Sequence, residues 1–306
     1  MSFSSDIKDE LCRFQVKENC CIHSECYGMW LFSKCFTKDR NAYTSENSGV
    51  TTRMAEFAAI TAGVFPEITF AVSRRKKPAY KLSIPNDHDR ETLINSFGHS
   101  GKETNLRINR ANFECDMCVS AFLRGAFLSC ASATDPNKEY HLEFSSQYRK
   151  LSVDLMSLIS EIDSLELSPS ITNRKGKFIV YLKDSGQMED FLTYIGAPGA
   201  SMQLMQVKMY KEAKNDINRK ANFETANMDK TYNASARQIA SIAFLNDTKG
   251  LDFLPKALED LARFRLNNPE MSLREISEQF GLTKSGVNHR MNKILQTAKE
   301  NGFETL

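Results

Sequence analysis

Two segments of the chain resemble each other at an offset of 97 residues, from position 26 to position 123. They read CYGMWLFSK and LRGAFLSCA, and each is an apolar stretch of helical type with glycine in third place, Gly28 and Gly125. Similar elements are expected after each at matching distances: a short strand (42–46, 140–144), a helix (50–63, 146–164), two strands (67–72 with 80–84, 166–172 with 177–182) and a closing helix (89–97, 186–195). The pattern predicts two copies of one α/β unit, whose glycines let the two leading helices approach closely.

The last two strands of each copy are joined by a basic turn. The first turn contains Arg74, Arg75, Lys76 and Lys77, and the second contains Arg174, Lys175 and Lys177. Cations on two matching hairpins could contact the phosphates of DNA. They are also common on exposed hairpins, where they protect strand edges from pairing with other chains. Both interpretations stay open from the sequence alone.

The segment 272–299 has the pattern of a helix-turn-helix. Ser272, followed three residues later by Glu275, is a capping box at the start of a helix, and Gly281 can adopt the left-handed backbone that ends it. Thr283 caps a second helix, whose apolar stripe is Val287, Met291, Ile294, Leu295 and Ala298. Two short helices joined by a turn with glycine predict this motif.

The other face of the second helix is polar, and no acidic residue occurs between Glu278 and Glu300. Short polar and amide side chains suit base edges in the major groove, and cations beside them suit phosphates. The alternative is a helical hairpin with a solvated face, but such a face usually mixes acids with bases. The candidate DNA-binding residues are Thr283, Lys284, Ser285, Asn288, His289, Arg290, Asn292, Lys293 and Gln296.

The region between these parts is expected to be helical with one interruption. A helix over 201–220 has Met202, Met205 and Met209 in a rough stripe, which usually packs in a core or between domains. The asparagine-rich run 215–227 predicts a linker or hinge. The expected domains are therefore 1–200, with repeat halves at about 20–100 and 115–200, a linker helix or hinge over 201–226, and a helical domain over 227–306.

Composition, net charge and the lengths of the apolar runs indicate where in the cell the protein is expected. Apolar residues make up 41% of the 306 residues and the net charge is only +2, so a DNA-binding surface has to be local. The first residues, MSFSSDIKDELCRF, lack the apolar core of a signal peptide, and no apolar run approaches the length of a membrane span. A cytoplasmic, nucleoid-associated protein without membrane contact is expected.

All eight cysteines precede residue 131. Cys115 and Cys118 form a C-x-x-C pair, and Cys20, Cys21 and Cys26 lie near His23, so a zinc site can be assembled on paper. A second well-spaced C-x-x-C pair is missing, and several of these residues fall at helical core positions. We therefore expect buried thiols, with no metal and no cofactor.

The duplicated glycine helices resemble the LAGLIDADG helices of homing endonucleases. That resemblance implies two αββαββα units, joined along the paired helices, which lay a saddle of strands on DNA. The nucleases carry a metal-binding carboxylate at the eighth position of each motif, where this chain has Ser33 and Cys130. Neither can replace a pair of hard oxygen ligands for magnesium, and Asp39 and Asp135 lie further on, as expected of turn residues. No catalytic residue is therefore predicted.

The whole chain resembles one family more closely. CVSAFLRGAFLSCASATDPNKEYHLEF (118–144), INRKANFETANMDKT (217–231) and LTKSGVNHRMNKI (282–294) are similar to the WhiA family of Gram-positive bacteria. The resemblance implies an α+β fold: a duplicated αββαββα LAGLIDADG-like saddle, followed by an all-α, sigma-region-4-like helix-turn-helix domain. In the first LAGLIDADG-like helix, Lys34 replaces the final glycine of the motif.

These observations predict a sequence-specific regulator of transcription that binds double-stranded DNA and is not an enzyme. The family resemblance adds a role in sporulation, or in cell division and chromosome segregation. Two alternatives remain. The saddle could bind a protein, such as another transcription factor or an RNA polymerase sigma subunit, or the chain could be a residual DNA endonuclease.

Overall fold

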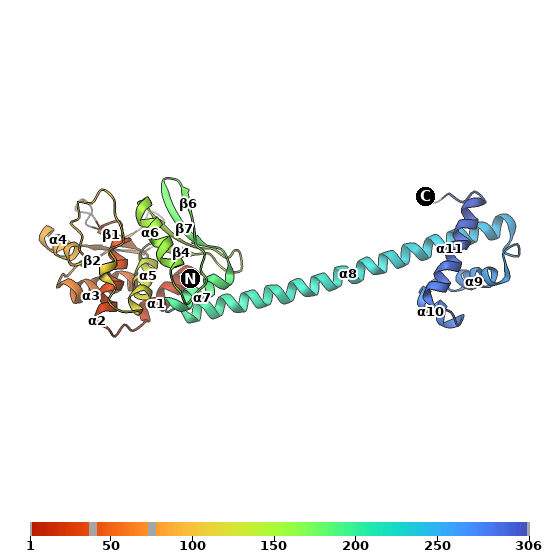
Figure 1. Cartoon of the computed structure of the whole chain (residues 1–306), viewed down its shortest axis with the longest axis horizontal. Helices are drawn as coiled ribbons and strands as arrows, with labels where there is room; N and C mark the ends of the chain where they lie inside the picture. The colour runs from red at the N-terminus through yellow and green to blue at the C-terminus, as the bar shows by residue number, and fades with distance from the viewer. Residues whose placement is uncertain (1, 37–41, 73–77, 305–306) are drawn as a thin grey trace. The chain divides into compact units, whose positions relative to one another are not determined.

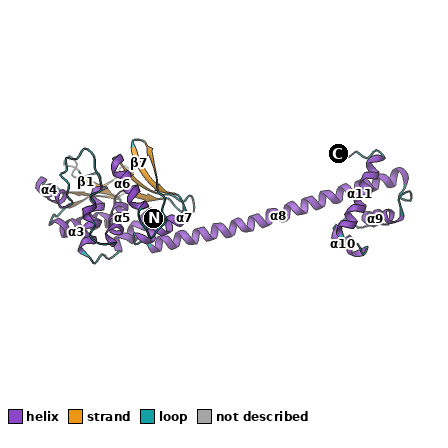
Figure 2. Ribbon diagram, in the orientation of Figure 1, coloured by secondary structure: helices purple, strands orange, loops and turns teal. Residues whose placement is uncertain are grey.

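The computed structural model describes residues 2–36, 42–72 and 78–304 (Figure 1). Contacts divide the chain into two compact units, Met1–Lys211 and Glu212–Leu306. All strands that the structure describes lie in the first unit, and the described elements of the second unit are helices (Figure 2). The predicted class, a duplicated α+β domain followed by an all-α domain, is confirmed.

The two copies have the predicted order of elements. The first contains α2 (Asn19–Leu31), β1 (Ala42–Ser45), α3 (Ser48–Ala62), β2 (Glu67–Val72), β3 (Pro78–Ser83) and α4 (Asp87–Ser96). The second contains α5 (Met117–Cys130), β4 (Ala131–Ala133), β5 (Leu142–Ser146), α6 (Arg149–Ser160), β6 (Ser170–Arg174), β7 (Lys177–Leu182) and α7 (Ser185–Tyr194). The strand β4 was not predicted, because three residues are too short to show an alternating pattern. Helix α1 (Phe3–Arg13) precedes the copies, and the 3-10 turn η1 (Arg110–Asn112) lies between them.

Each copy builds an antiparallel sheet. The strand orders are β1-β3-β2 and β4-β5-β7-β6. In the second sheet, Arg174 pairs with Lys177 across a two-residue turn, and both turn residues have positive φ, 52° at Lys175 and 76° at Gly176. Such a turn matches the twist of the two strands that it joins. The hairpin that carries the second basic turn is therefore locally well defined.

Helices α2 and α5 cross at the two glycines. A Cβ atom on Gly28 would lie 2.2 Å from the carbonyl oxygen of Phe122, and one on Gly125 would lie 2.1 Å from the carbonyl oxygen of Glu25. Both distances are far below van der Waals contact, so no other residue fits at either place without moving a helix. The predicted close approach of the two leading helices is confirmed.

A buried ion-pair cluster also joins the copies. Glu25 on α2 accepts hydrogen bonds from Arg53 of α3 at 2.5 Å and from Arg124 of α5 at 2.7 Å, and all three side chains are nearly inaccessible to solvent. Arg124 also donates to the carbonyl of Ile195, and its guanidinium lies over the ring of Phe14. A charge removed from water is tolerated only when it is paired in this way.

Helix α8 runs without interruption over Pro198–Lys249. Its first N–H groups are capped by α1, since the carboxylate of Glu10 accepts from Gly199 at 2.7 Å and from Ala200 at 2.9 Å. The break predicted in the asparagine-rich run does not occur, because residues 200–249 contain neither glycine nor proline and asparagine alone only weakly disfavours a helix. The methionine stripe does not pack in the core of the first unit, where Met202, Met205 and Met209 are all exposed. Its packing between domains stays a prediction.

The second unit has its own core. The end of α8 packs with α9 (Lys256–Asn267), α10 (Leu273–Gln279) and α11 (Lys284–Glu300). The buried residues include Ile242, Leu245, Leu261, Ile276, Val287, Met291 and Ile294. Of the helices that the structure describes, none is both long and apolar enough to cross a bilayer.

Candidate nucleic-acid interface

Helices α10 and α11 form the predicted helix-turn-helix. The Ser272 hydroxyl accepts from the N–H of Glu275 at 3.3 Å, and the Glu275 carboxylate accepts from the N–H of Ser272 at 2.7 Å. Gly281 ends α10 with a φ of 62°, and the Thr283 hydroxyl accepts from the N–H of Gly286 at 3.1 Å to start α11. Both capping residues and the turn glycine therefore act as the sequence predicted.

The structure buries one side of α11 and exposes the other. Val287, Met291, Ile294 and Ala298 are buried in the core of the second unit. Of the predicted DNA-binding residues, Arg290 is half-buried and the rest are exposed, namely Thr283, Lys284, Ser285, Asn288, His289, Asn292, Lys293 and Gln296. The exposed side offers amide and imidazole groups that can both donate and accept hydrogen bonds, as base edges require.

The acids nearest this face are engaged with neighbours. Glu278 lies 3.5 Å from Arg274 on α10, and Glu300 accepts from the amide of Gln296 at 3.1 Å. Gln296 is therefore partly occupied within its own helix. The Thr283 hydroxyl is also engaged, as the cap of α11. The exposed side chains of Asn288, His289 and Asn292 remain to face a ligand, with cations at Lys284 and Lys293.

A second basic surface lies on the sheet of the second copy. Arg174, Lys175 and Lys177 are exposed on the β6–β7 hairpin. The register places Arg174 and Lys177 on the sheet face opposite Val180 and Leu182, which are buried against the helices. The Arg174 guanidinium lies 3.9 Å from the carboxylate of Glu143, at the outer limit of an ion pair. The matching residues of the first copy, Arg74, Arg75, Lys76 and Lys77, lie outside the described residues.

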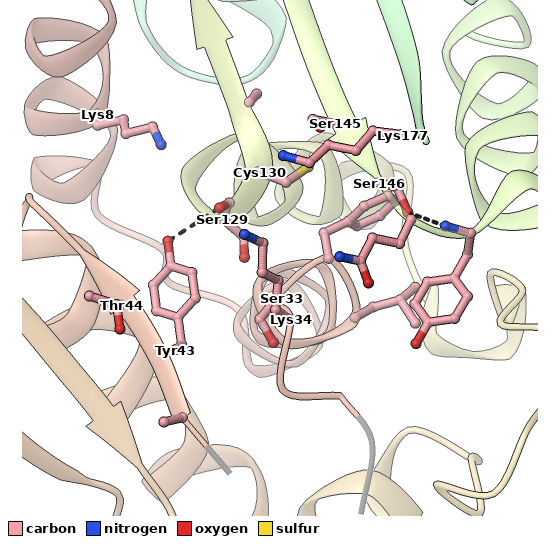
Figure 3. A pocket seen from close by; sticks show the side chains of 16 residues that line it. Lys8, Ser33, Lys34, Tyr43, Thr44, Ser129, Cys130, Ser145, Ser146 and Lys177 are labelled. Carbon is pink, nitrogen blue, oxygen red and sulfur yellow. Dashed lines mark hydrogen bonds between the residues drawn. The ribbon is translucent and has the colours of Figure 1, made fainter. Parts of the chain in front are cut away.

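The residues at the eighth motif positions, Ser33 and Cys130, come together beside one pocket of about 410 Å³ (Figure 3). Three lysines line the same pocket: Lys8, Lys34 and Lys177. Lys8 donates from Nζ to the carbonyl of Leu128 at 3.1 Å, close to the C-terminal end of α5, where a helix favours a cation. Burial lowers the pKa of Lys8. The sequence pattern did not predict that Lys8 would reach this place from α1.

The lining of the pocket is unsuited to a hard metal ion. No carboxylate occurs among the described residues that line it. The Ser33 hydroxyl donates to the carbonyl of Trp30 at 2.6 Å, and burial raises the pKa of the Cys130 thiol to about 12, so both groups are neutral near pH 7. Magnesium requires anionic oxygen ligands, whereas lysines attract anions. The pocket therefore suits a phosphate group better than a divalent cation.

The two aspartates considered at the sequence level do not change this conclusion. Asp135 is absent from the lining of the pocket and accepts from the N–H and the amide of Asn137, both at 2.9 Å, as a turn residue does. These hydrogen bonds lower the pKa of its carboxyl group. Asp39 lies outside the described residues.

The cysteines behave differently from the expectation of buried thiols. Cys20, Cys21, Cys115 and Cys118 gather so that their sulfur atoms all lie within 4.8 Å of one another. Cys115 is exposed and Cys20 is half-buried, so these two are not simple core residues. The sequence showed both groups but not that the fold would bring them into contact.

Comparisons with known proteins agree with both parts of this structure. Residues 119–214 match the family described as "WhiA LAGLIDADG-like domain", and residues 217–298 match the "WhiA C-terminal HTH domain". A "Probable cell division protein WhiA" from Ruminiclostridium cellulolyticum is 36% identical over 98% of this chain and 97% of its own length. One of the same name from Thermoanaerobacter sp. (strain X514) is 35% identical over 98% of each chain.

The fold is similar to that of a solved relative. The crystal structure of full-length WhiA from Thermatoga maritima matches all of both chains with a TM-score of 0.58 and 23% sequence identity. At 23% identity, this match shows similarity of fold alone. Because the sequence relatives above cover almost the whole chain at more than a third identity, the chain belongs to the WhiA family.

Proposed function

We propose that the chain is a sequence-specific DNA-binding regulator of transcription without catalytic activity. The observation that carries this proposal is the exposed, acid-poor face of α11, held by two capped helices on a separate core. In a helix-turn-helix, the second helix enters the major groove and its first residues contact base edges. Asn288, His289 and Asn292 take the role of reading bases, and Lys284 and Lys293 bind phosphates.

The saddle contributes phosphate contacts in this proposal. The exposed cations Arg174, Lys175 and Lys177 lie on or beside a polar sheet face, and Lys34 and Lys177 border the pocket at the end of the motif helices. Phosphate contacts fix the position of a protein on the duplex without reading its sequence. A single helix-turn-helix contacts few bases, so added contacts of this kind strengthen binding.

The names of the relatives support a proposal for the cellular role. Those reported above are named cell division proteins, and we infer that this chain regulates genes of cell division and chromosome segregation, or of sporulation where the organism sporulates. Such a regulator works in the cytoplasm at the nucleoid.

Crosslinking of the protein to DNA in cells, followed by sequencing, tests the proposal. Wild type is compared with a His289→Ala, Lys293→Ala double variant and with Lys230→Ala, a control for the loss of an exposed cation on α8. Discrete sites upstream of genes are expected for wild type and for the control, and their loss is expected in the double variant. Sites that persist in the double variant would assign base reading to the saddle.

A complete absence of sites would favour the alternative in which the saddle binds a protein partner, such as a sigma subunit or another transcription factor. Deletion of residues 1–200 separates the two cases. If the saddle binds a protein partner, the truncated protein should keep its DNA affinity but lose regulation.

The absence of catalysis has its own test. Plasmid DNA incubated with the protein and magnesium or manganese is expected to stay intact. Nicking that is abolished by Asp39→Ala or by Asp135→Ala would show that a residual endonuclease is present.

A further inference from the structure

Four cysteines from distant parts of the sequence meet at the start of the two paired helices. Cys20 and Cys21 lie in the first turn of α2, and Cys115 and Cys118 bracket the start of α5. The sulfur of Cys115 lies 3.6 Å from that of Cys20, 3.6 Å from that of Cys21 and 3.5 Å from that of Cys118. All four are free thiols, and their sulfur atoms lie within 4.8 Å of one another without disulfide bonds.

The spacing of these atoms fits a tetrahedral metal site. A zinc ion with Zn–S bonds of about 2.3 Å requires its four sulfur ligands to be about 3.8 Å apart. The three distances from the Cys115 sulfur, 3.5–3.6 Å, are close to that value, and all four sulfur atoms lie within 4.8 Å of one another. A set of four sulfur donors is soft and favours zinc over magnesium or calcium. We propose that Cys20, Cys21, Cys115 and Cys118 bind one structural zinc ion.

The surroundings of the four thiols also suit metal binding. Neither α2 nor α5 has a side-chain cap: Glu18 and Asp116 occupy the capping positions without accepting a hydrogen bond from the helix. The N-terminal ends of α2 and α5 therefore lie at the cluster, where the helix dipoles favour the negative charge of metal-bound thiolates. The N–H of Cys115 also donates to the sulfur of Cys118 at 3.5 Å.

Hydrogen bonds around the cluster hold its two halves together. The Ser24 hydroxyl, one turn beyond Cys20, donates to the carbonyls of Cys20 at 2.9 Å and of Asn112 at 2.7 Å. The side-chain oxygen of Asn112 accepts from Nε2 of His23 at 2.8 Å. Such contacts orient the segments that carry metal ligands and are a regular part of metal sites.

The site is of the structural kind. Four protein ligands leave no open position for a substrate or water. Cys21 and Cys118 are buried beside Ala121, whereas Cys115 is exposed and gives an ion a way in. Bound zinc would link residues 95 positions apart and fix the ends of α2 and α5 beyond their crossing at the glycines. The two copies of the repeat would thus be joined by a metal as well as by packing.

Metal analysis of the full chain tests this assignment. The protein is purified in reducing buffer without a metal-binding tag. After gel filtration in a buffer that contains a weak chelator, its zinc content is measured by elemental mass spectrometry. About one zinc ion per chain is expected for wild type, as for other sites with four cysteine ligands. Cys115→Ser is expected to lose it, and Cys12→Ser, which removes a half-buried thiol elsewhere, is expected to retain it.

Cobalt binding provides a second measurement that needs no variant. Wild type stripped by a strong chelator and titrated with cobalt(II) should develop the thiolate charge-transfer and intense visible bands of a tetrahedral sulfur site, and zinc should displace them. The assignment is overturned if wild type contains no zinc and gives no such bands. It is also overturned if the four cysteines are found in disulfides under reducing conditions, or if Cys115→Ser retains full zinc.

Discussion

Arg124 of α5 donates from its Nε to the carboxylate of Glu25 on α2 across 2.7 Å, where neither side chain is open to water. Because α2 and α5 belong to different copies of the repeat, this ion pair depends on their correct association. Glu25 is also the only acid that the described ion pairs assign to Arg53, at 2.5 Å. One carboxylate is thus the ionic partner of two buried guanidinium groups.

Loss of that carboxylate should destabilise the first unit strongly. Glu25→Gln keeps the size of the side chain but leaves Arg53 and Arg124 charged and unpaired, and we expect a loss of about 3–5 kcal/mol in the free energy of unfolding. Urea denaturation followed by circular dichroism measures it. Glu161→Gln is the matched control, because its pair with Arg110 is half-exposed and should contribute less than about 1 kcal/mol. Equal effects of the two changes would contradict the importance of the buried cluster.

The crossing of the paired helices should not tolerate a methyl group. In Gly125→Ala the new atom would meet the backbone of Glu25, which cannot rotate away, so we expect a loss of about 3 kcal/mol or more. Gly186→Ala in α7 is the control, since a Cβ there meets only the Asp184 side chain at 3.2 Å. Alanine should be neutral or slightly stabilising at that helical position. Thermal melting of both variants compares them, and a Gly125→Ala protein as stable as wild type would argue against the described crossing.

The capping box should control the first helix of the helix-turn-helix. Ser272→Ala removes the acceptor for the N–H of Glu275 and should cost about 1 kcal/mol. Ser272→Asp should restore most of that stability, because aspartate is an equally good capping residue. Hydrogen exchange of the α10 amides measures the local effect. Identical exchange rates in wild type and both variants would show that the cap does not limit the local unfolding of α10.

Residues of α11 should separate into two classes by their effect on DNA binding. Asn288→Ala or His289→Ala should reduce discrimination between the preferred site and random DNA by about 1–3 kcal/mol, because each loses a base contact. Lys293→Ala should weaken binding to all sequences alike and reduce the slope of log affinity against log salt by about one unit. Fluorescence anisotropy on both DNAs at several salt concentrations makes the comparison. Equal losses on both DNAs for all three variants would exclude base reading by this face.

Local patterns predicted those parts of the structure that depend on neighbouring residues. Gly28 and Gly125 showed the paired helices, and Ser272, Gly281 and Thr283 marked the bounds of α10 and α11, because caps and turns are encoded within a few positions. The caps and turns follow from local backbone geometry, whereas the pairing of the two glycine helices was predicted from the internal repeat.

The remaining features depend on contacts between distant segments. Lys8 reaches the pocket from another helix, and the four cysteines meet only because α2 packs on α5. The continuity of α8 through residues 215–227 was not predicted, for another reason. Asparagine weakens a helix without ending it, so the run 215–227 resembled a linker although nothing in it forces a break.

The glycine contacts are reciprocal, but the ion-pair cluster is not. Gly28 faces the carbonyl of Phe122 and Gly125 faces that of Glu25, so the backbone contacts alone would equally allow either copy to pair with itself. At the offset of 97 residues, however, Glu25 corresponds to Phe122, and Arg124 corresponds to Tyr27. Two first copies together would each leave Glu25 without its cross-copy arginine, and two second copies would leave Arg124 without an acid. The cluster therefore discriminates against like-with-like assemblies and favours association of the two unlike halves.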